Sequence, residues 1–275
     1  MSEPLGPPPA PSLGHGIGVI FRMQTRRLVR GRKLRLGLVS VALVLFAVVA
    51  ARYAGASGEV GPDRAAELAA AAVRDGIDWG FFHLLVFLIP FLFNAHAIGE
   101  EVESRTFTYL SSRPTGRFAI TVGKWAAGAL FGVALVVGAT LVLHVAAYAT
   151  EPSALVEELG GTLKAAGALA LLTLFYSSLC TFWGAVAPEA AGIISALYLA
   201  VIEFLFGLLP GYFRCISMNY LGQQLAGLEK GGLMAESAPD VPMMIGASVI
   251  AMMAILFLGF AAMVVQISEY RFNRA

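Results

Sequence analysis

Residues 79–98, WGFFHLLVFLIPFLFNAHAI, decide the fold class of this chain. The run contains no Asp, Glu, Lys or Arg, and a helix of this length crosses the roughly 30 Å of hydrocarbon in a bilayer at about 1.5 Å per residue. It lacks the alternation of polar and apolar residues that a membrane β-barrel strand shows. A transmembrane helix is therefore predicted here.

The whole chain has the same apolar character. Of its 275 residues, 58% are hydrophobic and only 13% are charged, where soluble domains carry about 25% charged residues. The mean hydropathy is +0.76. Irregular backbone does not span lipid, so we expect an all-α integral membrane protein with six transmembrane helices. The predicted spans are residues 35–53, 79–98, 121–149, 162–187, 190–210 and 243–267, within a single domain over 34–275.

The basic residues predict the orientation of these spans. Lys and Arg are retained on the cytoplasmic side of short loops, and most of the 19 basic residues lie before the first span, after the second or after the sixth. Both termini are therefore predicted to be cytoplasmic.

Four segments outside the spans have their own patterns. Residues 1–14 are rich in proline and are expected to be a disordered tail, whereas 15–33 alternate apolar and basic residues as an interfacial helix does. A basic flank that only sets topology is the alternative for 15–33. Residues 63–75 predict a short surface helix on the outer side. Residues 211–242 are too broken to span and too apolar for a free loop, which predicts an outer re-entrant segment.

The charged segment 99–120, GEEVESRTFTYLSSRPTGRFAI, interrupts the apolar runs on the cytoplasmic side. Acidic residues precede about two turns of predicted helix, which Pro114 ends because the residue before proline is disfavoured in the α conformation. Phe107 and Leu110 share one face within a charged rim, as in a docking surface for a peripheral protein. A solvated loop that only anchors the spans is the alternative.

The same segment carries a family resemblance. Its pattern resembles the permease subunits of type-2 ATP-binding-cassette exporters, including the copper-maturation and gliding-associated branches. The matching residues are Glu100, Glu101, Glu103, Thr106, Pro114, Arg117, Gly123 and Lys124.

The resemblance implies a cytoplasmic coupling helix that docks on a separate ABC ATPase dimer, which would bind ATP and Mg. It implies pairing with a second permease copy or a paralogue, contact with membrane lipid, and the inner membrane of a prokaryote. It also leaves open an extracytoplasmic partner in place of a solute. The implied docking residues are Glu100, Glu101, Glu103, Arg105, Thr106, Phe107, Leu110, Arg113, Pro114 and Arg117.

The chain itself is expected to be non-catalytic and to bind no cofactor, metal or nucleic acid. Residues 116–125, GRFAITVGKW, superficially resemble a phosphate-binding loop. Six residues rather than four separate the two glycines, however, and Trp125 stands where such a loop needs Ser or Thr for magnesium.

Polar residues within the spans are costly and are therefore candidates for function. Glu203, His83 and His144 are predicted at similar depth near the outer surface, where with Arg52 they would line an outer vestibule of the translocation path. Two alternatives remain: local structural bonds for each side chain, or a stand-alone ion-coupled or metal carrier built on Glu203, His83 and His144.

Overall fold

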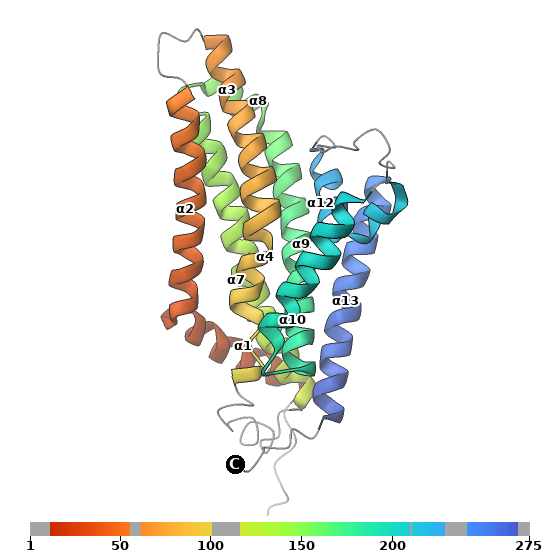
Figure 1. The fold of residues 1–275 in the computed structure, drawn as a ribbon. Coiled ribbons are helices and arrows are strands. Elements are labelled where there is room, and N and C mark those ends of the chain that lie inside the picture. The colour runs from red at the N-terminus through yellow and green to blue at the C-terminus, as the bar shows by residue number, and fades with distance from the viewer. Residues whose placement is uncertain (1–11, 56–61, 101–115, 210, 229–240, 269–275) are drawn as a thin grey trace, which may run out of the picture.

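The computed structural model describes residues 12–55, 62–100, 116–209, 211–228 and 241–268 (Figure 1). All regular structure in these residues is helical. Among them, five helices are long and apolar enough to cross a membrane. These are Arg32–Gly55, Arg64–Asn94, Arg117–Ala147, Leu159–Val186 and Met243–Ile267. The predicted all-α membrane fold is confirmed.

The fifth predicted span corresponds to a shorter apolar helix. It comprises α10 (Ala191–Tyr198), the π-helical η2 (Leu199–Leu205) and α11 (Phe206–Leu208). A tight turn separates it from the preceding span, closed by a hydrogen bond of 3.0 Å from the Ala190 amide to the carbonyl of Ala187.

The second span is longer than expected. Helix α3 (Pro62–Asp75), the π-helical η1 (Gly76–Leu85) and α4 (Val86–Asn94) follow one another without a break, so the prediction of a separate surface helix over 63–75 is wrong. Four turn residues, 95–98, then lead to Glu100. We refer to the continuous helix 62–94 as the long rod.

The long rod continues through Gly76 because this glycine serves packing rather than helix termination. A Cβ atom on Gly76 would lie 2.8 Å from Val48 Cγ1, and one on Gly80 would lie 2.6 Å from Val44 Cγ1. Both valines belong to α2 (Arg32–Gly55), whose side chains fill the space that the two glycines leave. Close helix approach through small residues is common in membrane bundles.

Helix α9 (Leu159–Val186) forms the centre of the bundle. In the 18-residue apolar stretch of α9, 72% of the residues are buried. The corresponding value for α2 is 17%, so α2 lies at the edge of the bundle. Around α9 pack α4, α7 (Arg117–Ala147) and α13 (Met243–Ile267), with Leu169, Leu172, Phe175 and Leu179 among the fully buried core residues.

Helix α1 (Leu13–Arg30) crosses one end of the bundle and does not run parallel to the other helices (Figure 1). It begins inside the expected tail because the Ser12 hydroxyl accepts a hydrogen bond of 3.4 Å from the His15 amide. It ends before Gly31, so residues 32 and 33 of the predicted interfacial helix belong to α2. We call this end of the molecule the α1 end.

The opposite end carries α3, α8 (Pro152–Glu157), the 3-10 helix η3 (Gly211–Ile216) and α12 (Met218–Ala226) (Figure 1). We call it the α12 end. The predicted re-entrant segment is described only in part, as η3 and α12, because residues 229–240 lie outside the described residues. Helix α12 packs against α9, α13 and η1 and ends at Gly227, whose φ of 74° suits glycine.

Candidate functional site

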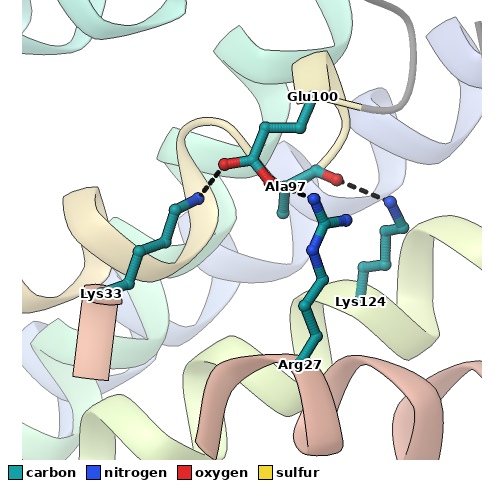
Figure 2. Close-up of polar contacts among 5 residues, drawn as sticks. All are labelled: Arg27, Lys33, Ala97, Glu100 and Lys124. Atoms are coloured by element: carbon teal, nitrogen blue, oxygen red, sulfur yellow. Dashed lines mark hydrogen bonds and ion pairs between the residues drawn. The ribbon is translucent and has the colours of Figure 1, made fainter. Parts of the chain in front are cut away.

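Glu100 joins three parts of the chain at the α1 end. Its Oε2 accepts a hydrogen bond of 2.7 Å from Arg27 Nη2 on α1, and its Oε1 pairs with Lys33 Nζ at the start of α2 (Figure 2). The Glu100 side chain is 31% exposed. Ion pairs this exposed contribute only about 0–1 kcal/mol to stability, so they matter more for fixing position.

Lys124 secures the same region from α7. Its side chain is almost completely buried, and its Nζ donates a hydrogen bond of 2.7 Å to the carbonyl oxygen of Ala97, in the turn after α4 (Figure 2). The carbonyls at a helix end lack partners within the helix and favour a nearby positive charge. Lys124 therefore holds the turn that follows the long rod against α7, one turn before Glu100.

Gly123 allows α1 to cross α7 at close range. A Cβ atom at this position would lie 2.9 Å from Ile20 Cβ and 3.0 Å from the carbonyl oxygen of Ile17. The Gly-Lys pair of the family pattern thus has two physical roles. The glycine admits α1, and the lysine binds the turn that follows α4.

Arg117 anchors the other side of the charged segment. Its Nη1 donates hydrogen bonds of 3.1 Å to the Gln266 carbonyl and 3.3 Å to the Ser268 carbonyl, at the end of α13. Glu100 and Arg117 were both predicted to contact a partner protein. The structure gives each of them bonds within its own chain, so they act as the two anchors of segment 99–120.

The other predicted docking residues lie outside the described residues. The short helix expected around Phe107 and Leu110 therefore stays a prediction. The same holds for Glu101, Glu103, Arg105, Thr106, Arg113 and Pro114.

Comparison with known families decides the identity of the chain. Residues 19–275 match the family model described as ABC-2 family transporter protein. The chain belongs to this family. It is therefore a multi-pass membrane permease of an ABC transporter, and the family implies an ABC ATPase partner and a dimeric assembly. The match does not assign the permease to one branch, and no curated protein matched the chain.

At the α12 end of the permease, Glu203 binds the start of α12. Its Oε2 accepts hydrogen bonds of 2.8 Å from the Ser217 hydroxyl and 3.0 Å from the Asn219 amide, and Ser217 in turn caps α12 by accepting from Tyr220 N. A carboxylate at a helix N-terminus is stabilised by the helix dipole. Glu203 is 6% exposed.

A second carboxylate holds α12 from the long rod. Asp78 Oδ1 accepts a hydrogen bond of 3.2 Å from Gln223 Nε2, one turn beyond Asn219. His83 contacts the same residue, with its Nδ1 2.8 Å from the Asp78 carbonyl oxygen, and stacks on Trp79. Sequence reasoning missed Asp78, although an acidic residue at the edge of the apolar run 79–98 was a usable signal. Asp78 and Glu203 together form what we call the α12 clamp.

His144 and Arg52 lie in separate environments. His144 Nε2 donates a hydrogen bond of 2.9 Å to the Leu155 carbonyl, and its Nδ1 is 2.8 Å from the Thr162 hydroxyl. Arg52 Nη2 donates a hydrogen bond of 3.1 Å to the Ala65 carbonyl. Among the described residues no three His, Cys, Asp or Glu side chains come together as metal ligands. The geometry favours local structural bonds for these two residues. Glu203 and Asp78 both bind α12, and His83 contacts Asp78.

Proposed function

We propose that the chain is the transmembrane permease subunit of an ABC exporter, which couples ATP hydrolysis by a separate ATPase to export or to a transmembrane conformational change. Segment 99–120 is the docking site for the ATPase, which binds ATP and Mg. The α1 end faces the cytoplasm, in the inner membrane of a prokaryote, and two copies or a copy and a paralogue form the path.

The observation that carries this proposal is the double anchoring of segment 99–120. Glu100 ties its first end to α1 and α2, and Arg117 ties its second end to α13. Lys124 adds a bond between α7 and the turn before Glu100. A partner that displaces this segment therefore pulls on several membrane helices at once, as coupling requires.

The orientation is supported by charge. The α1 end carries the exposed arginines of α1 and the start of α2, and basic residues near short loops stay in the cytoplasm. The α12 end is then extracytoplasmic. There the α12 clamp and His83 form the polar part of the outer path, for a solute or for an extracytoplasmic partner.

Docking is tested by purifying the tagged full-length permease in mild detergent together with the ATPase of its host. We expect the ATPase in stoichiometric amount with the wild type and its loss with Phe107→Asp/Leu110→Asp, because carboxylates replace the apolar pair at the centre of the contact. The matched control is Tyr212→Asp/Phe213→Asp, which changes two exposed aromatic residues at the α12 end and should leave the ATPase bound.

Two results would contradict the proposal. An ATPase that stays with the Phe107/Leu110 variant as firmly as with the wild type would show that segment 99–120 is not the docking site. A permease that purifies alone and carries out ion-driven uptake in vesicles would instead identify a stand-alone carrier.

A further inference from the structure

The arginines of α1 form a regular row. Arg22, Arg26 and Arg30 are spaced four residues apart, and all three are exposed. Two residues before each arginine is a buried residue: Ile20, Gln24 and Leu28, respectively. Two residues correspond to about 200° around a helix, so the arginine row lies on the side turned away from α7. We call Arg22, Arg26 and Arg30 the arginine row.

Large apolar side chains accompany the arginine row. Val19, Met23 and Val29 are 48%, 39% and 53% exposed in the part of the chain that the structure describes. A row of arginines beside several large exposed apolar residues is typical of a helix that lies at a membrane surface. The mixture therefore favours lipid over solvent around α1.

The neighbouring helix sets the depth of α1 in the membrane. Helix α2 starts directly after Gly31 with exposed Arg32 and Arg35, and its exposed apolar surface begins at Leu36 and Val39. Only 17% of the 18-residue apolar stretch of α2 is buried, and a surface this apolar lies at the depth of the hydrocarbon core. Helix α1 joins α2 less than two turns before that boundary, which puts the arginine row at the level of the lipid headgroups.

We infer that the arginine row binds the phosphate groups of anionic lipids in the leaflet at the α1 end. A guanidinium group binds phosphate through paired hydrogen bonds, and clusters of basic residues beside a membrane helix attract anionic lipids. The exposed valines and methionine insert beside the acyl chains of the same lipids. This inference is independent of ATPase docking, because no residue of segment 99–120 takes part in it.

Native mass spectrometry of the full-length permease tests this inference. The protein is purified in mild detergent and mixed with equal amounts of phosphatidylglycerol and phosphatidylcholine, which differ in headgroup charge. We expect the wild type to retain phosphatidylglycerol preferentially and Arg22→Gln/Arg26→Gln/Arg30→Gln to lose about tenfold or more of that preference, because each basic residue near an anionic surface contributes a few-fold.

Two controls separate charge from folding. Arg22→Lys/Arg26→Lys/Arg30→Lys keeps the charge and should keep most of the preference. Arg64→Gln removes an exposed arginine from α3 at the other end and should change nothing. The wild type alone provides an independent readout, because raising the salt concentration should abolish its preference for phosphatidylglycerol by screening the charges.

Three outcomes would overturn the inference. The first is a glutamine variant that melts like the wild type and keeps its full preference for phosphatidylglycerol. The second is a glutamine variant that keeps the lipid but loses the ATPase, which would assign the arginine row to the protein partner. The third is displacement of the lipid by inorganic phosphate at a low ionic strength at which the same concentration of chloride salt leaves the lipid bound, which would indicate a site for a free anion.

Discussion

Single residues at the α1 end have distinct physical roles. Gly123 provides space, Lys124 provides one buried donor, and Glu100 provides an acceptor for two cations. Because Lys124 and Glu100 engage consecutive parts of one turn, a change at either residue alters the start of segment 99–120.

The space at Gly123 is testable by substitution. Gly123→Leu should lower the melting temperature of the purified permease by several degrees, because overpacking typically costs about 1–3 kcal/mol. The Cβ atom alone would meet Ile20 Cβ at 2.9 Å. Tryptophan fluorescence during heating in detergent measures the effect.

Gly138 offers the matched control for this substitution. It lies in the same helix, and a Cβ atom there would meet nothing within 4 Å. Gly138→Leu should therefore leave the melting temperature unchanged or raise it, since leucine favours the helix by somewhat less than 1 kcal/mol. Equal losses in both variants would mean that α1 does not pack closely on α7.

At the scale of single residues, the sequence pattern identified which residues are important but not which residues they contact. Glu100, Arg117 and Lys124 stand out in a local pattern that reads along the chain. Their partners are far away in sequence, such as Arg27 for Glu100 and Gln266 for Arg117. Local spacing contains no information on such long-range pairs, so only the packed bundle reveals them.

Among the elements, α12 is held by polar contacts from two other helices. It is a helix of nine residues, too short to be stable alone, and the α12 clamp holds it from η2 and from the long rod. Loss of one carboxylate should therefore loosen the whole helix and the adjoining η3.

Cys215, in η3, reports this loosening. Glu203→Ala should increase the rate at which maleimide labels Cys215, because the Ser217 hydroxyl and the Asn219 amide lose their acceptor. Burial raises the pKa of the Cys215 thiol in the wild type, so the reactive thiolate is scarce at neutral pH. Exposure lowers that pKa towards its ordinary value, and labelling becomes faster at the same pH.

The control for this labelling is Glu189→Gln. This exposed carboxylate lies in the turn before α10 and should leave the labelling rate of Cys215 unchanged. If Glu203→Ala labels no faster than the wild type, Glu203 does not hold α12 in place.

Element boundaries show where sequence patterns are insufficient. The long apolar runs were correctly predicted as helices because their length alone requires it. The separate helix over 63–75 was wrong because Asp75 and Gly76 look like a helix end, whereas packing against Val44 and Val48 keeps the rod continuous. The π-helical stretches η1 and η2 have no simple local signature and were not expected.

At the scale of the whole molecule, the long rod connects the α12 clamp at one end to the ion pairs of Glu100 at the other. Asp78, near the α12 end, and Glu100, just beyond the other end of the rod, belong to one continuous stretch of chain. We expect a shift of Glu100 to be transmitted along this rod towards Asp78 and hence to α12. This path would link segment 99–120 to the α12 end of the molecule.

The orientation of the molecule has a direct test with its two free cysteines. An impermeant maleimide added to intact cells should label Cys215, which lies at the α12 end, and spare Cys180, which is fully buried in α9. A Cys215→Ser variant should give no signal. Labelling of Cys215 only after permeabilisation would reverse the predicted topology.

The central claim is that the ion pairs of Glu100 connect segment 99–120, the proposed docking site, to the membrane helices. It is tested most directly by the ATPase rate of the reconstituted complex after charge reversal. We expect Glu100→Lys to abolish the stimulation of the ATPase by the permease while the ATPase stays bound. Adding Arg27→Glu and Lys33→Glu should restore it, because opposite charges again face each other. Full stimulation with Glu100→Lys alone, or no recovery in the triple variant, would contradict the claim.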